Sequence, residues 1–199
     1  MQKQLVSFNF LDLKACTLCA SRFGATVTSH SPRPVFQGEG SARILIAGQA
    51  PGLRVHESGQ PFTDPSGDRL RAWMGIGEDI FYDAGRIAIL PMSFCFPGYD
   101  SKGADLPPPP VCAITWRSAM LLQFPNIVLT ILVGGYAQKW HLKTKLSVQA
   151  VVGDWQIYLP QIIPLPHPSW RNNAWLKKNK WFEAEVLQVL RQKVQEALF

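Results

Sequence analysis

The sequence has few cysteines, few charged residues and no long apolar run. Its longest apolar stretch, residues 127–133, contains Thr130 and is far shorter than the ~20 residues that a membrane-spanning helix requires. Residues 1–10 lack the apolar core and the small-residue cleavage site of a signal peptide. We therefore expect a cytoplasmic protein that does not associate with a membrane, in a compartment where disulfides are rare.

Internal repeats are also absent, and the only low-complexity segment is a run of four prolines at 107–110. Hydrophobic residues make up 47% of the chain and charged residues 17%, a balance that excludes an intrinsically disordered protein. The 199 residues predict one domain, 1–199, which would bury about 70% of its unfolded surface. A core of that size does not need a metal or disulfides in order to fold.

The four cysteines fall into two distant segments. Cys16 and Cys19 form a C-x-x-C pair, whereas Cys95 and Cys112 are separated by sixteen residues. In a reducing compartment four such thiols favour a metal centre over cystines. Zinc sites of four cysteines usually contain two C-x2-C pairs, so the wide second spacing favours a [4Fe–4S] cluster over zinc. Four buried thiols without a metal are a third reading, which leaves the C-x-x-C pair unexplained.

Four apolar segments predict buried strands, and each is followed by a glycine or a proline that would end it. Helical patterns lie between them, which predicts a mostly parallel four-stranded sheet covered on both faces. The expected fold class is therefore α/β, a three-layer α/β/α sandwich. The predicted strands are residues 43–47, 86–90, 127–133 and 155–163.

Three helices have recognisable signals. Ser66 is placed to cap a helix that contains Leu70, Trp73 and Met74, and residues 115–124 form a second candidate. The clearest helix is 179–198, where Asn179 can act as the cap and apolar residues recur at three- and four-residue steps.

In parallel sheets, ligands bind beyond the carboxyl ends of the strands. Two segments at these ends have a restricted backbone. Gly-Gln-Ala-Pro-Gly at 48–52 predicts a tight turn that exposes its backbone to a ligand. His167 lies between Pro166 and Pro168, which suits a donor that must meet a ligand at a fixed distance; an incidental histidine in a stiff loop is the alternative.

A basic segment follows His167. Three tryptophans alternate with cations there, in a stretch without acids, and the whole chain carries a net charge of +6. Cations for phosphates beside flat rings for bases are typical of nucleic-acid binding, although a solvated basic loop would have the same composition. The tryptophans are Trp170, Trp175 and Trp181, and the cations are Arg171, Lys177, Lys178 and Lys180.

Together, these motifs resemble the uracil-DNA glycosylase superfamily, in particular its iron–sulfur branch. That branch has the motif G-E-A-P-G followed by G-x-P-F, which residues 48–52 and 59–62 match in spacing, and a later H-P-S, matched by 167–169. Its four cysteines are spaced much like those found here. The resemblance implies a [4Fe–4S] cluster and hydrolysis of the bond between deoxyribose and uracil, or another deaminated or damaged base, in base excision repair.

The resemblance also implies roles for individual residues. Phe62 would stack on a base flipped out of the DNA, and the backbone of Gln49 and Ala50 would line its pocket. His167 would donate a hydrogen bond to the carbonyl oxygen of the leaving base, where negative charge develops. Trp170 or Arg171 would fill the gap that the flipped base leaves.

The remaining DNA contacts are expected from Ser169 and from the lysines of the basic segment, namely Lys177, Lys178 and Lys180. Trp181 is expected to pack the last helix onto the sheet, and Trp175 is a weaker candidate for DNA. His56 is interpreted as a histidine of a surface loop, with a contact to phosphate or sugar as the alternative. Partners other than DNA are not predicted, and we expect a monomer.

The chain departs from the family pattern at three positions. Gln49 and Ala50 stand where relatives carry an acid or an asparagine, so we nominate Asp64 to position the attacking water, against a role in capping or a turn. Asp68 is interpreted as an ordinary acid of a first helical turn. Pro91 replaces an asparagine that reads the edge of uracil, and Ser93 is a partial substitute, which leaves the identity of the excised base open.

Three functions follow from these observations. The first is a monofunctional DNA glycosylase, because no amine occupies an obvious nucleophilic position for strand cleavage. The second is a nucleic-acid-binding protein that kept the pocket but lost efficient hydrolysis, which Gln49 and Ala50 favour. The third is an enzyme of the same fold that acts on a free nucleoside or on RNA.

Overall fold

The structure is a computed structural model that describes residues 9–199. At its centre is a sheet of four parallel strands in the order β2-β1-β3-β4. Apolar side chains occupy both faces of the sheet, as expected for parallel strands that are covered on both sides. The strands are β1 (Ile44–Ala47), β2 (Ile87–Ile89), β3 (Leu129–Val133) and β4 (Ile162–Leu165).

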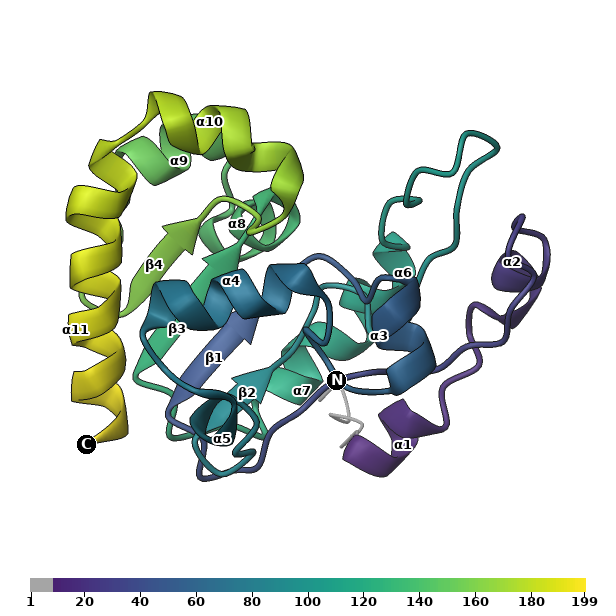
Figure 1. The fold of residues 1–199 in the computed structure, drawn as a ribbon. Coiled ribbons are helices and arrows are strands. Elements are labelled where there is room, and N and C mark those ends of the chain that lie inside the picture. The colour runs from purple at the N-terminus through teal and green to yellow at the C-terminus, as the bar shows by residue number, and fades with distance from the viewer. Residues whose placement is uncertain (1–8) are drawn as a thin grey trace.

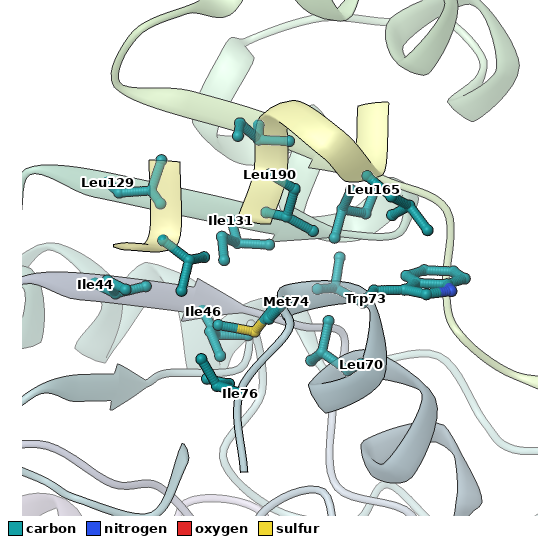
Figure 2. Close-up of a cluster of buried hydrophobic side chains, with 14 of the residues drawn as sticks. Ile44, Ile46, Leu70, Trp73, Met74, Ile76, Leu129, Ile131, Leu165 and Leu190 are labelled. Carbon is teal, nitrogen blue, oxygen red and sulfur yellow. The ribbon is translucent and has the colours of Figure 1, made fainter. Parts of the chain in front are cut away.

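Helices α4 (Pro65–Met74) and α11 (Leu187–Leu198) cover one face of the sheet (Figure 1). Alternate residues of β1, Ile44 and Ile46, point into this layer, where they join Leu70 and Leu190 from the two helices (Figure 2). All four of these side chains are fully buried. This cluster is the larger part of the hydrophobic core.

The opposite face is covered by one continuous helical segment and by α8 (Gly135–Leu142). The segment consists of α6 (Pro110–Cys112), a π-helical turn (Ala113–Arg117) and α7 (Ser118–Leu121). Leu45 of β1 points to this side, in agreement with the alternation along a strand. The predicted three-layer α/β/α sandwich is confirmed, and the sheet is entirely parallel.

Shorter elements connect these layers. None of the helices between residues 9 and 199 is long and apolar enough to cross a membrane. The α-helices are α1 (Phe10–Lys14), α2 (Ala20–Gly24), α3 (Leu53–Ser58), α5 (Glu78–Phe81), α9 (Val148–Gly153) and α10 (Asn173–Lys178). Two 3₁₀ helices span Trp155–Tyr158 and Trp170–Asn172, and a second π-helical turn, Phe182–Val186, leads into α11.

The strand predicted at 155–163 is wrong over most of its length. Residues 155–158 form the 3₁₀ helix, and the strand begins only at Ile162. The backbone N–H groups of Ile157 and Leu159 donate within this helix and its end, to the carbonyl oxygens of Asp154 and Gln156, and not to a neighbouring strand. Pairing with β3 starts directly afterwards, where the N–H of Thr130 donates to the carbonyl oxygen of Gln161.

The two predicted caps are also wrong. Ser66 lies inside α4, and Asp64 occupies the cap position because Pro65 takes the first helical position, for which its fixed φ angle is suited. Asn179 closes the end of α10 instead: its side chain donates to the carbonyl oxygen of Trp175 and accepts from the indole N–H of Trp181. The helix predicted at 115–124 begins earlier, at Pro110, and ends at Leu121.

Candidate active site

A cavity of about 540 Å³ opens at the carboxyl ends of the strands. The segments after β1, β2 and β4 meet there, as the positions of their glycines and prolines predicted. The turn 48–52 forms one wall, and Pro91 and His167 come from the two other strand ends. Further lining residues are Phe62, Asp64, Asp105, Ser169, Trp170, Arg171 and Asn172.

His167 is held at the cavity by hydrogen bonds on both its ring and its backbone. The N–H of Ser169 donates to Nδ1 of the ring at 3.2 Å, and the side-chain amide of Asn172 donates to the His167 carbonyl oxygen at 2.7 Å. Since Nδ1 accepts a hydrogen bond, the neutral ring carries its proton on Nε2. Within residues 9–199, Nε2 has no hydrogen-bond partner, so this N–H is available to a ligand.

The electrostatic surroundings favour the neutral ring. Burial lowers the pKa of His167 below its ordinary value, and the charges of Asp64 and Asp105 oppose this shift only in part. A neutral imidazole with its proton on Nε2 is a donor that needs no prior protonation at pH 7.

Arg69 of α4 fixes the loop that carries His167. Its guanidinium donates to the Ser169 carbonyl oxygen at 3.1 Å and to the Asn173 side chain at 2.8 Å. Ser169 is therefore held at its carbonyl by Arg69, while its N–H holds the imidazole. No sequence pattern marks this contact, because the partners are about a hundred residues apart and arginines are common on helix surfaces.

Phe62 faces the cavity in an unusual backbone conformation. Its φ angle is +56°, in the left-handed region that a bulky residue rarely adopts. The Phe62 carbonyl oxygen accepts hydrogen bonds from the Tyr82 hydroxyl at 3.1 Å and from Arg71 at 3.4 Å. The ring lies 3.5 Å from the position that a Cβ atom on Gly48 would take. Strain of this kind persists where several partners hold the residue, commonly at functional sites.

Arg71 and Gly67 of α4 explain how the Phe62 conformation is held. Arg71 is nearly buried and forms ion pairs with Asp68 and Glu78, which fix its guanidinium under the Phe62 carbonyl. Gly67 packs so tightly against this carbonyl that an added Cβ atom would overlap its oxygen. Asp68 was predicted to be an ordinary acid of a first helical turn. Its ion pair with Arg71, which helps to hold Phe62, was not predicted.

Two carboxylates line the cavity. Asp64 stands at the start of α4 without capping it; both of its oxygens accept from the Ser66 hydroxyl at 2.8 Å. Asp105 was not anticipated from the sequence. It lies 3.9 Å from Arg171 across the mouth and is presented by the loop that follows the third cysteine.

Of the other predicted base-binding residues, Gln49 and Ala50 lie at the cavity and Ser93 does not. Gln49 and Ala50 line the cavity and are half-buried, and the Gln49 carbonyl oxygen accepts from the N–H of Ser93. The Ser93 side chain does not reach the cavity. It is buried, and its hydroxyl lies against the Cys95 carbonyl and the Cys112 thiol instead. Pro91 takes the place at the cavity wall that Ser93 was expected to share.

The basic segment divides into two parts. Ser169, Trp170 and Arg171 line the cavity mouth, and the Trp170 side chain is 73% exposed. Lys177, Lys178 and Lys180 are exposed beyond the cavity, at and after the end of α10. The two other tryptophans of the segment, Trp175 and Trp181, pack with Phe182 against the core. Trp175 is therefore a packing residue, and Trp181 packs as predicted.

His56 was predicted on a surface loop, but it lies on α3 and is half-buried. Its ring is 5.0 Å from that of His30, and its Nδ1 is buried without a hydrogen-bond partner among residues 9–199. The reason is that residues 53–58 close into a helix which packs on the segment around His30. No contact with the cavity is shown for this histidine.

The four thiols share one side of the molecule. Cys95 and Cys112 are buried, Cys16 and Cys19 are half-buried, and the N–H of Phe94 donates to the Cys112 sulfur at 3.4 Å. Burial, followed by the charge of Cys112, raises the pKa of Cys95 to about 12, and Cys16 and Cys19 add to this shift. The four sulfurs thus lie within electrostatic reach of one another. In the part of the chain that the structure describes, no three Cys, His, Asp or Glu residues are spaced to hold a single metal ion.

Comparison with known proteins assigns the family. The model of the Uracil DNA glycosylase superfamily matches residues 35–191, which is most of the chain. The chain belongs to this superfamily. The match is to the superfamily as a whole, and the iron–sulfur branch stays a prediction.

Among solved structures, the chain is similar to the solution NMR structure of a protein from Methanosarcina acetivorans named as a candidate uracil DNA glycosylase. The identity is 18%, the TM-score is 0.47, and the match covers 80% of this chain and 98% of the other.

The packing of Gly67 under Phe62 generates a prediction about stability. We expect Gly67→Ala to lower the free energy of unfolding by about 1–3 kcal/mol, because the new methyl group overlaps the Phe62 carbonyl oxygen. Urea unfolding measures the change. Gly153→Ala is the matched control, since its Cβ atom would have nothing within 4 Å, and it should not destabilise the protein. Equal effects at the two positions would contradict the packing described here.

Proposed function

We propose that this protein is a monofunctional DNA glycosylase that hydrolyses the N-glycosidic bond of uracil or another deaminated or damaged base. It would act as a monomer on DNA in the cytoplasm, in the first step of base excision repair. Membership of the superfamily supports a DNA glycosylase role. The observation that supports hydrolysis of a damaged base is the arrangement of His167. Its ring is neutral, and the hydrogen bond from the Ser169 N–H to Nδ1 leaves the ring proton on Nε2.

The proposed chemistry uses this N–H at the moment when charge develops. As the bond between C1′ and the base nitrogen breaks, the electron pair leaves with the base and spreads onto its carbonyl oxygen. A donor fixed in advance stabilises that oxygen without reorganising. Water adds to the sugar carbon, which has become an oxocarbenium ion, and its proton ends on the departing base or in solvent. The atoms balance without any further reactant.

Phe62 and Asp64, which line the same cavity, would support this step. The Phe62 ring lines the cavity beside the glycine turn and offers a flat surface on which a flipped base can stack. Asp64 is proposed to hold the attacking water. Its carboxylate accepts from the Ser66 hydroxyl, which keeps it at the cavity in place of the helix N–H groups that it would otherwise cap.

Pro91 bears on which base is accepted. A proline offers no side-chain hydrogen bond, so selection for uracil by pairing with its edge is weakened. We propose uracil as the default substrate, with hypoxanthine and xanthine as further candidates because deamination also produces them. The shape of the cavity, more than a side-chain amide, would then exclude normal bases.

A second candidate function is a DNA-binding protein with this fold that hydrolyses poorly. The observation that favours it is the absence of a carboxylate at Gln49 and Ala50, both of which line the cavity. This candidate predicts tight binding of damaged DNA without release of the base.

We also propose that Cys16, Cys19, Cys95 and Cys112 hold a [4Fe–4S] cluster, with zinc as the alternative. Each cysteine of such a cluster binds a different iron, so the sulfurs lie farther apart than the ligands of a single ion. The Cys95 thiol interacts electrostatically with the three other cysteines, which supports grouping the four in one site. Burial raises the pKa values of Cys95 and Cys112, and these thiols would release their protons to solvent on binding a metal. The cluster would pin the N-terminal segment to the helix that contains Cys112.

The function is tested with duplex and single-stranded oligonucleotides that carry uracil, hypoxanthine or xanthine. We expect abasic product on at least one of them, and we expect His167→Ala to lower turnover by about 10²–10³-fold because the donor is lost. DNA affinity should change far less. Tight binding of every substrate without product supports the second candidate, and equal losses of turnover and affinity in His167→Ala remove the role assigned to this residue.

The tautomer can be tested at Ser169. Its φ angle of −73° is compatible with proline. Ser169→Pro replaces the N–H donor by a ring carbon, which removes the hydrogen bond to Nδ1 and pushes the His167 ring out of its position. At saturating protein we expect the single-turnover rate to fall about tenfold or more, whereas Ser169→Ala, which keeps the N–H, should keep this rate even if loss of the hydroxyl weakens DNA binding. Single-turnover excision assays compare the two variants. A larger loss in the alanine variant would assign the effect to the hydroxyl instead.

The cluster is tested on protein purified without oxygen. We expect a brown protein with absorbance near ~400 nm, and Cys16→Ser or Cys112→Ser should lose most of this absorbance. Thr17→Ala, between the first two cysteines, is the control and should keep it. A colourless protein that contains one zinc per chain would overturn the cluster.

A further inference from the structure

Arg117 is a fully buried arginine to which the proposed reaction assigns no role. It is the last residue of the π-helical turn Ala113–Arg117 and is 0% exposed. One guanidinium nitrogen, Nη1, donates to the carbonyl oxygens of Leu90 and Pro91, the latter at 3.1 Å. The other, Nη2, lies 2.6 Å from Nε2 of His141, and the group sits over the Trp140 ring. π-Helical turns are rare and frequently lie at functional sites.

No carboxylate in residues 9–199 forms an ion pair with Arg117, and its Nε has no hydrogen-bond partner there. Burial lowers the pKa of Arg117 to about 9, so the cation persists at pH 7. Burial and the Arg117 charge lower the pKa of His141 to about 3, so this imidazole is neutral and accepts the hydrogen bond. The Cys112 charge favours the Arg117 cation without pairing with it directly, so the guanidinium depends for its hydrogen bonds on the Leu90 and Pro91 carbonyl oxygens and on His141.

The contacts of Arg117 lie directly behind the base pocket. Leu90 and Pro91 follow β2, and Pro91 forms part of the cavity wall. The same helical segment holds the other end of this loop, because the Cys112 sulfur accepts from the N–H of Phe94. The segment 90–94 is thus fastened at its cavity end by Arg117 and at its cysteine end by Cys112.

We infer that Arg117 is a positioning residue for the base pocket: it holds the Leu90–Pro91 carbonyls from behind so that Pro91 keeps the cavity wall in place. The inference rests on the proposed function, and it names the residue on which selection of the base depends. Since Pro91 has no side-chain hydrogen bond, it can exclude a normal base only through its position. A wall that moves would admit undamaged bases as well.

The chemistry of arginine suits this task. Its planar guanidinium presents several N–H groups in a fixed fork, which can reach two consecutive carbonyls and an imidazole at once. Lysine has the same charge but presents it at a single point, so it can satisfy only part of this set. Methionine has a similar length and no donor, and it would leave the two carbonyls and His141 without their partner.

The experiment measures how well the protein distinguishes damaged from undamaged DNA. Duplexes with uracil, hypoxanthine or xanthine, and a matched undamaged duplex, carry a 2′-fluoro sugar at the target nucleotide so that the base is not released. The measured quantity is the affinity for a damaged duplex divided by the affinity for the undamaged duplex. We expect Arg117→Met to lower this ratio about tenfold, because a wall that can move fits a damaged base less closely and no longer keeps out a normal one, while phosphate contacts are untouched. Arg117→Lys should give an intermediate ratio.

The control separates positioning from general loss of stability. Val194 is buried in α11, on the other face of the sheet, and Val194→Ala should lower thermal stability without changing the ratio. An unchanged ratio in Arg117→Met, or the same fall in Val194→Ala, overturns the inference and leaves the proposed function intact. A wild-type protein that prefers none of the damaged duplexes contradicts the proposed function, and the inference falls with it. If Arg117→Met does not fold, the ratio of Arg117→Lys decides by the same criteria.

Discussion

The site depends on one hydrogen bond, from the N–H of Ser169 to Nδ1 of His167. It determines which ring nitrogen carries the proton, and therefore whether the cavity meets a donor or an acceptor. Burial keeps the ring neutral, and the prolines on both sides restrict the backbone that presents it. A donor prepared in this way needs no rearrangement when charge develops on a leaving base.

Helix α4 organises most of the surroundings of that donor. Its first turn carries Asp64 and Gly67, which face the cavity and the Phe62 carbonyl. One turn later, Arg69 holds the loop of His167 and Arg71 holds Phe62. Because the apolar side of the same helix is buried against the sheet, the site is supported by the core itself (Figure 2). Arg117 provides a comparable support for the wall at Pro91 from the other face.

Much of the fold could be predicted from the sequence. The strands at 44–47, 87–89 and 129–133 have continuous apolar runs with a glycine or proline after them, a pattern with few alternatives. The meeting of the three strand ends at a cavity follows from parallel topology alone. The strand predicted at 155–163 was wrong over most of its length because a short apolar segment can also form a helical turn, as Trp155–Tyr158 does.

The support of the site was harder to predict, for a physical reason. Arg69, Arg71 and Arg117 act through hydrogen bonds to backbone carbonyls, and every residue has such a carbonyl, so no motif marks the partner. Asp105 was missed because it reaches the cavity from a loop with no regular pattern. Ser93 was misplaced since the direction of a side chain in a buried loop depends on tertiary packing that local sequence does not encode.

The protonation state of His167 is the most direct test of this account. Nitrogen-15 NMR of the ring, assigned by comparison with His167→Ala, distinguishes a protonated from an unprotonated ring nitrogen. We expect a neutral ring at pH 7 with the proton on Nε2 and an unprotonated Nδ1. A proton on Nδ1, or a doubly protonated ring at that pH, would contradict it.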